Sequence, residues 1–392
     1  MKYRIHGGAI VTDTVQNADL LISDGKIEGI IPYDAPIDPE YEIINADGCY
    51  VTPGFVDVHQ HGGGGADYMD GTADDFYLAT SAHLAHGTTS VMPTLLSADT
   101  DGLMRAISGY KAALSDPRIK ANLIGIHVEG PYISPKQAGA QKPEHIRKFD
   151  PDEYTAITKF AEGNIRRWSV APEVDGAIDF ANFAQKHGIT LSIAHSDADL
   201  DTVQKAFDLG YRHITHFYSC VSTITRRNGY RVAGILEAGY LMDDMDIEII
   251  ADGSHIPPDL LRYVMKFKDS DHIALVTDSM RAAGQNVSES FLGSARDPLP
   301  VVVEDGVAKL TDRTAFAGSV ATADMLLKTM LKIDTPLPVA VKMLTVNPIR
   351  MMHLDVNKGL LEPGYDADVC IFDGDINVKC VLAMGNVVHT TV

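Results

Sequence analysis

The stretch Pro53-Gly54-Phe55-Val56-Asp57-Val58-His59-Gln60-His61 bears most directly on the fold. It is a short, mainly apolar run that ends in two histidines two positions apart. Alternate side chains of a β-strand share one face, so His59 and His61 are expected to point the same way. The pattern predicts a buried strand with metal-binding or catalytic side chains at its carboxyl end.

Outward from this stretch, short apolar runs alternate with helical patterns of about ten to fifteen residues, which predicts βαβ units and a parallel sheet. Eight runs fit strands, the number that closes a (β/α)8 TIM barrel. The predicted strands are Gly54–His59, Thr88–Pro93, Leu123–Val128, Arg167–Ala171, Thr190–Ala194, His213–Phe217, Ile247–Ala251 and His272–Thr277.

Both ends of the chain have a different sequence pattern, which predicts β-strands without helices. Strand-like segments fill the first fifty residues around a hairpin signal at Asp24-Gly25, and residues 367–373 and 378–390 are similar. We therefore expect one small β-sandwich domain built from residues 1–52 and 353–392. The barrel, residues 53–352, is then inserted between its two halves. The length of 392 residues fits this division, because a barrel needs about 250.

Composition excludes some classes of partner. The formal net charge is -20, and such a surface repels nucleic acid and anionic membranes, so neither is expected as a partner. A local arginine or a ring of backbone N–H groups can still bind a small anion. The four cysteines form no CxxC pair, the first residues lack a signal-peptide core, and no apolar run is long enough to span a bilayer. A cytoplasmic location is expected.

Titratable side chains follow most of the predicted strands. Their carboxyl ends meet at one face of a parallel barrel, so residues far apart in sequence are expected to share one pocket. Histidine and carboxylate side chains are ligands of divalent transition metals. The residues concerned are His59, His61, Glu129, His195, His216, His255 and Asp278.

Each of these residues also has an ordinary structural explanation. A lone histidine at a strand end is more often hydrogen-bonded than metal-bound, Glu129 alone could form a surface ion pair, and Asp278 alone could cap a helix. Independent accidents would not fall at the same end of six strands, however. The constellation therefore favours a metal centre, with Glu129 bridging or ligating and Asp278 within reach of a water.

Specific motifs along nearly the whole chain carry a family resemblance. The Pro53–His61 phrase and the tail segment Glu362–Asp368 resemble signatures of the amidohydrolase superfamily. Further motifs, which follow one another along the chain, resemble those of the N-acetylglucosamine-6-phosphate deacetylase family. They are Gly125–Tyr132 with Gly139-Ala140, Ala171–Glu173, Ala194–Asp197, Thr215-His216, Asp252–His255, Thr277–Met280 and Ala317–Ser319.

The resemblance implies an amidohydrolase-type barrel with one or two divalent metals. Glu129, His195 and His216 match the ligands of the family's catalytic metal, and His59 with His61 match a second site beside Glu129. Other amidohydrolases bridge two metals with a carboxylated lysine on strand four. The matching segment, Trp168–Ala171, has no lysine, so Glu129 takes that role. Zinc is the first expectation, with iron, cobalt, manganese and nickel as alternatives.

The resemblance also assigns roles around the metal. Asp278 matches the catalytic acid/base and His255 a substrate-binding histidine near the scissile amide. Contacts to the sugar phosphate match Ala140, Ser219, Cys220, Arg227, Phe316, Ala317 and Gly318. The family's arginine comes from the neighbouring subunit, which implies a homodimer in which Arg227 reaches across.

Two departures fall among the residues that recognise the sugar. The family usually has Asn-Ala where this chain has Ser219-Cys220, and histidine where it has Gln141. The implied reaction is removal of the N-acetyl group from an N-acetylhexosamine 6-phosphate. N-acetylglucosamine 6-phosphate is the first choice, and it would give glucosamine 6-phosphate and acetate.

Several other functions stay open. They are deacetylation of N-acetylgalactosamine 6-phosphate, and a D-aminoacylase or dihydroorotase-like activity. A barrel that binds a ligand without catalysis is a further alternative, but such a protein is expected to have lost a ligand or the acid. Glu129, His195, His216 and Asp278 are all present.

Overall fold

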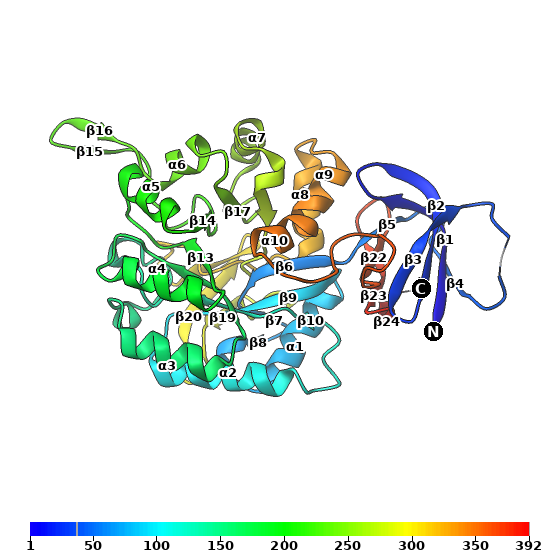
Figure 1. Ribbon diagram of the computed structural model, residues 1–392, viewed down its shortest axis with the longest axis horizontal. Coiled ribbons are helices and arrows are strands. Elements are labelled where there is room, and N and C mark those ends of the chain that lie inside the picture. Colours follow the sequence, from blue (N-terminus) through cyan, green and yellow to red (C-terminus); the bar gives the residue numbers. More distant parts are fainter. Residues whose placement is uncertain (37, 392) are drawn as a thin grey trace.

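Two sheets of different kind lie side by side in this computed structural model, which describes residues 1–36 and 38–391. Figure 1 shows a barrel surrounded by helices, and next to it a smaller sheet that holds both termini. Residues 37 and 392, which belong to the predicted terminal domain, lie outside the described residues.

The barrel is a run of parallel strands in the order β6-β9-β11-β12-β13-β14-β17-β18. The ring closes because Asp278 N–H donates to His59 O at 2.8 Å and His61 N–H donates to Ser279 O at 2.9 Å. The bounds are β6 Phe55–Gln60, β9 Thr88–Leu95, β11 Ile126–Glu129, β12 Ile165–Val170, β13 Thr190–Ile193, β14 Tyr211–Ile214, β17 Asp246–Ile249 and β18 Ile273–Leu275. Each of the eight predicted strands is confirmed, with ends that move by a few residues.

Helices cover the outside of the barrel, as the alternating pattern predicted (Figure 1). Their apolar faces and the strands share one large core that includes Trp168, Phe180 and Leu326. The helices are α1 Ala73–Leu84, α2 Thr100–Ala113, α3 Pro151–Ala161, α4 Ala177–Lys186, α5 Leu200–Asp208, α6 Ile235–Leu241, α7 Pro258–Phe267, α8 Ala323–Lys332, α9 Leu337–Leu344 and α10 Val346–Met351. Short 3-10 turns lie at Tyr68–Asp70, Pro135–Gln137, Pro143–His145 and Ser270–His272.

The two ends of the chain form one sheet, in the order β24-β23-β22-β5-β1-β2-β3, with β4 also on β1. Strand β22 pairs antiparallel with β5, which joins the ends, and apolar residues from both ends, such as Leu20 and Leu382, form one cluster. The strands are β1 Lys2–Val11, β2 Val15–Ser23, β3 Lys26–Pro32, β4 Glu42–Asn45, β5 Tyr50–Pro53, β22 Val369–Phe372, β23 Val378–Ala383 and β24 Asn386–Thr390. The domain boundaries at residues 52 and 353 stay an interpretation.

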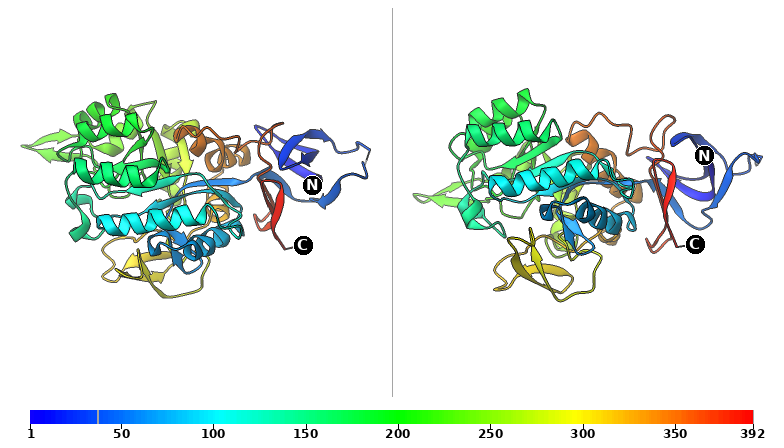
Figure 2. Two further views of the ribbon diagram at one scale, coloured as in Figure 1. Left: turned by 60° about the horizontal axis from the view of Figure 1, so that its bottom comes forward. Right: turned by 90° about the horizontal axis from the view of Figure 1, so that it is seen from below.

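Two excursions leave the barrel. The segment 221–234 contains a hairpin of β15 Thr225–Arg227 and β16 Tyr230–Val232 that projects away from the molecule (Figure 1). A three-stranded sheet, unpredicted, follows β18 and appears in yellow below the barrel in Figure 2; its strands are β19 Glu289–Leu292, β20 Leu299–Glu304 and β21 Val307–Leu310. Short strands β7 Gly62–Gly63, β8 Ala66–Asp67 and β10 Asn122–Leu123 complete the structure. Among the described residues, no helix is both long and apolar enough to cross a bilayer.

Candidate metal centre and active site

The predicted site residues meet at the carboxyl ends of the barrel strands. His59 lies near the end of β6 and His61 directly after it, while Glu129 is the last residue of β11. His195 and His216 each follow the last residue of their strand, β13 and β14, by two positions. These five side chains, drawn from strands one, three, five and six, are all buried.

Glu129 is the centre of the cluster. Its Oε1 lies 2.9 Å from His216 Nε2 and 3.3 Å from His195 Nε2. The two imidazole Nε2 atoms are themselves 3.2 Å apart, as expected of two side chains that face one ligand. Glu129, His195 and His216 therefore form a compact N,N,O group that could hold a metal ion.

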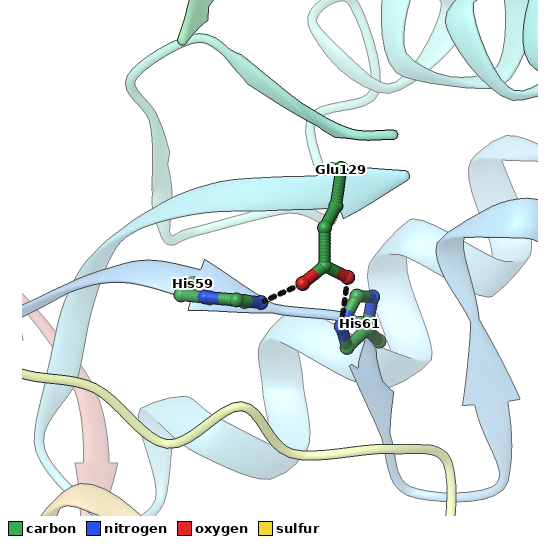
Figure 3. A group of neighbouring side chains, drawn as sticks. All are labelled: His59, His61 and Glu129. Atoms are coloured by element: carbon green, nitrogen blue, oxygen red, sulfur yellow. Dashed lines mark ion pairs between the residues drawn. The ribbon is translucent and has the colours of Figure 1, made fainter. Parts of the chain in front are cut away.

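A second such group shares the same carboxylate. Figure 3 shows His59 and His61 facing Glu129 from the strand below, each joined to a different carboxylate oxygen. His59 Nε2 lies 3.7 Å from Oε1, and His61 Nε2 lies 3.4 Å from Oε2. Glu129 therefore stands between two pairs of histidines and is placed to contact ions on either side.

The hydrogen bonding of the histidine rings is a separate indication that these side chains suit divalent metals. His59 Nε2 is buried and has no hydrogen-bond partner, although buried polar atoms are nearly always satisfied. In three of the four histidine rings, Nδ1 lies close to a hydrogen-bond acceptor of the protein, as is usual for histidines that bind a metal through Nε2. His59 Nδ1 lies 3.2 Å from Glu248 Oε2, His61 Nδ1 3.3 Å from Thr94 O, and His195 Nδ1 2.7 Å from Gln137 O.

The Glu129 carboxylate is held ionised and in place by its neighbours. Burial alone would raise the pKa of Glu129, but hydrogen bonds from His195 and His216 hold the pKa of its carboxyl well below the usual range. Gln141 adds a further restraint, because its Nε2–H donates to Glu129 Oε2 at 2.9 Å while its Oε1 accepts from Ser97 N–H at 3.0 Å. Glu129 is thereby fixed as an ionised, oriented carboxylate.

Asp278 faces the same point from strand eight. Its Oδ1 lies 3.1 Å from His61 Nε2 and 3.4 Å from His59 Nε2. Burial raises the pKa of Asp278, but its neighbours His59 and His61 outweigh that and lower it. An ionised carboxylate beside a metal centre can accept a proton there.

His255 is oriented by a neighbour that sequence reasoning did not single out as its partner. Asp252 Oδ1 accepts from the backbone N–H groups of Ser254 and His255, both at 2.8 Å, and its Oδ2 lies 2.7 Å from His255 Nδ1. The His255 ring also packs on Phe316, with centroids 4.5 Å apart. With Nδ1 engaged, Nε2 is the nitrogen left for a ligand. The Asp-x-x-His spacing was the available signal.

A cavity of about 250 Å³ opens over the centre. Most of the predicted recognition residues line it, namely Ala140, Ser219, Cys220, His255, Phe316 and Gly318. Ala317 is fully buried and is not part of the lining, and Arg227 lies outside this cavity, where its guanidinium pairs with Asp199 at 3.1 Å. Leu96, Tyr218, Leu292 and Ala315 also line the cavity and were not predicted.

Comparison with known proteins agrees with this geometry. Residues 50–389 match the model of the amidohydrolase family. The N-acetylglucosamine-6-phosphate deacetylase of Bacillus subtilis strain 168 is 31% identical, with 97% of this chain and 95% of that protein covered. The N-acetylgalactosamine-6-phosphate deacetylase of Escherichia coli O157:H7 is 27% identical, with 93% of each chain covered.

A solved structure is similar over its whole length. A mutant of N-acetyl-D-glucosamine-6-phosphate deacetylase from Mycobacterium smegmatis, in complex with N-acetyl-D-glucosamine-6-phosphate, superposes with a TM-score of 0.90 at 28% identity. The superposition covers 99% of this chain and 100% of that one. The protein therefore belongs to the amidohydrolase family and, within it, to the N-acetylglucosamine-6-phosphate deacetylases.

Proposed function

We propose that the protein hydrolyses the acetamide of an N-acetyl amino-sugar 6-phosphate, with N-acetylglucosamine 6-phosphate as the first substrate. The observation that carries this proposal is the convergence of four histidines on Glu129, with the Asp278 carboxylate facing the same point. The named activities of the relatives support the choice of substrate. The products would be acetate and the amino-sugar 6-phosphate.

Glu129, His195 and His216 would hold one divalent metal, and His59, His61 and Glu129 a second, with zinc the first candidate. A bound cation would supply Lewis acidity to the acyl carbonyl and make an attacking water more acidic. The protein itself would keep Glu129 ionised and positioned between the two pairs of histidines. Gln141 and the groups on the outer ring nitrogens provide that restraint.

Asp278 would move the proton. Its lowered pKa leaves the carboxylate ionised near neutral pH, so it accepts a proton as the water oxygen bonds to the acyl carbon. It then delivers that proton to the sugar nitrogen as the C–N bond breaks. His255, held by Asp252, would orient the acyl group through its free Nε2.

The sugar would lie against Ser219, Cys220 and Phe316 in the cavity. Ser219-Cys220 and Gln141 are the places where the chain departs from the family pattern, and a relative named for the galactosamine compound is 27% identical. N-acetylgalactosamine 6-phosphate is therefore the second candidate.

We also propose a homodimer, in which the β15–β16 hairpin delivers Arg227 to the neighbouring subunit. The hairpin projects from the barrel, and Tyr230 next to its turn is 78% exposed. Exposed apolar side chains lie on the segments next to it, including Ile224, Leu241 and Tyr263. A projecting hairpin beside an apolar face suits a self-complementary interface. A cytoplasmic location stays a prediction.

A panel of substrates tests the proposed reaction. Acetate release would be measured with N-acetylglucosamine 6-phosphate, N-acetylgalactosamine 6-phosphate, unphosphorylated N-acetylglucosamine and an N-acetyl-D-amino acid. The highest kcat/KM is expected for the glucosamine phosphate. A higher value for the unphosphorylated sugar or the amino acid would overturn the proposed substrate class.

A further inference from the structure

A second cavity lies beside the active-site cavity. It has a volume of about 230 Å³ and lies between the start of α2 and the segment that joins β19 to β20, drawn in cyan and yellow in Figure 2. The two cavities share a wall made of Leu96, Ala140, Gln141 and Leu292. None of the predicted metal ligands lines this second cavity.

Its lining is basic, although the chain as a whole is acidic. Arg105, Lys142 and Arg296 contribute three positive charges, against two negative charges from Asp99 and Asp297. The excess is notable because the formal net charge of the protein is -20. A local excess of cations inside an acidic surface attracts a small anion rather than an extended polyanion.

The two arginines lack internal partners. Asp297 is already paired with Lys142 and, at 2.8 Å, with His145 Nε2, while Asp99 Oδ1 accepts from Gly102 N–H at the start of α2. The side chains of Arg105 and Arg296 make no hydrogen bond or ion pair within the described residues. Arg105 Nε is also buried and without an acceptor.

A buried donor without an acceptor is unfavourable, so an acceptor from outside the protein is the simplest completion of this cavity. Guanidinium groups present forked donors that match the oxygens of phosphate. Apolar side chains, among them Met69 and Leu299, line other parts of the cavity and suit the carbon skeleton of a small ester.

We propose that this cavity is a second anion site that binds the phosphate group of a small molecule, held by Arg105 and Arg296. The ligand is either free phosphate or a phosphate monoester such as a sugar phosphate. Only the side chain of Gln141 connects this site to the metal centre. Gln141 lines the cavity, and its Nε2–H donates to Glu129 Oε2. It is separate from the cavity over Asp278, and it does not depend on the proposed reaction.

Equilibrium dialysis of the metal-loaded protein would test the proposal, with radiolabelled inorganic phosphate and with glucose 6-phosphate. The wild type and the Arg105→Gln/Arg296→Gln double variant would be compared for equivalents bound per subunit. The affinity of one class of site is expected to fall by about tenfold or more in the double variant, because two charged donors are lost. Tighter binding of one probe in the wild type identifies free phosphate or the ester as the ligand.

Three further variants make the result specific. Arg105→Lys keeps the charge and is expected to retain most of the binding. Arg118→Gln removes an exposed arginine elsewhere and is expected to bind like the wild type. Arg227→Gln is expected to keep this class of site, which separates it from the proposed contact to substrate phosphate. The proposal is overturned if the double variant, folded as judged by circular dichroism, binds both probes with wild-type affinity and stoichiometry.

Discussion

His195, His216 and Asp278 share a backbone conformation that L-residues rarely adopt. Their φ angles are 45°, 28° and 48°, and each residue comes just after a barrel strand. Such conformations cost about 1–3 kcal/mol each and persist where the surroundings enforce them. For Asp278 the enforcing contacts are visible, since its N–H donates to His59 O and its C=O accepts from Ser319 N–H, both at 2.8 Å. Strain at these positions aims the three side chains into one cavity.

Asp278→Asn tests the proposed proton carrier. The amide has nearly the same shape but cannot take up a proton, so kcat is expected to fall by about 10²–10⁴-fold. Metal content, measured by elemental analysis, is expected to stay near that of the wild type, because the histidines and Glu129 remain. A variant that keeps its metal and full turnover would remove Asp278 from the mechanism.

The chemistry-bearing residues could be predicted because each sits at a strand end in the sequence. His59, Glu129, His195 and His216 needed only the rule that parallel strands share an exit face. Asp252, three positions after β17, could be placed at the same face, but its contact with His255 could not be predicted. Gln141 could not be placed in this way, because its contact with Glu129 depends on the path of a loop after β11, about which a periodic pattern carries no information.

A buried ion pair connects strands β12 and β17 beneath the metal centre. Arg167 Nη2 donates to Glu248 Oε2 at 2.9 Å, and its Nη1 donates to Oε1. The same Glu248 Oε2 lies 3.2 Å from His59 Nδ1, so the pair holds a proposed ligand. Burial raises the pKa of Glu248, but the charge of Arg167 holds it well below the usual range. We infer that Glu248 is a positioning residue for His59.

Two variants separate positioning from stability. Glu248→Gln leaves the buried Arg167 charge unpaired, which is expected to lower the free energy of unfolding by about 3–5 kcal/mol. The double variant Arg167→Met/Glu248→Leu removes both charges and is expected to regain much of that stability. Metal content is still expected to fall toward one equivalent in the double variant, because His59 Nδ1 is no longer held.

Chemical denaturation and elemental analysis of the same samples provide the two readouts. A stable double variant that binds as much metal as the wild type would leave Arg167 and Glu248 a purely structural pair.

Sequence patterns predicted the barrel strands well and did not predict the inserted β19–β21 sheet. Strands buried on both faces appear as short continuous apolar runs, such as residues 273–275. The β19–β21 sheet mixes half-exposed residues and lies beyond the last barrel strand. Asp305-Gly306, between β20 and β21, was a hairpin signal equal to Asp24-Gly25. A pattern of alternating strands and helices has no position for a hairpin after its last strand.

The whole molecule is proposed to work as a pair of subunits, and subunit mixing tests this directly. Arg227→Ala and Asp278→Asn are each expected to lose most activity on the phosphorylated substrate. In a mixed dimer, the Asp278→Asn subunit would lend Arg227 to its partner, whose own Asp278 is intact. Mixing equal amounts under conditions of exchange should then restore about a quarter of wild-type activity. No recovery, with mixed dimers verified by mass spectrometry, would place Arg227 outside the neighbour's site.

The organisation of the molecule as a whole followed from composition and order along the chain. All-β ends around an alternating middle predicted a sheet that both termini share, and β5 pairs with β22 across 318 residues, from Thr52 to Cys370. The direction in which the β15–β16 hairpin leaves the barrel was not encoded in any local pattern of the sequence.

A metal held by Glu129, His195 and His216 is proposed to be needed for hydrolysis of the acetamide. The most direct measurement is the rate of acetate release from N-acetylglucosamine 6-phosphate before chelation, after removal of the chelator with its metal, and after addition of zinc. We expect activity to be lost in step with the metal and to return with the added ion. Full activity in protein shown by elemental analysis to be metal-free would contradict it.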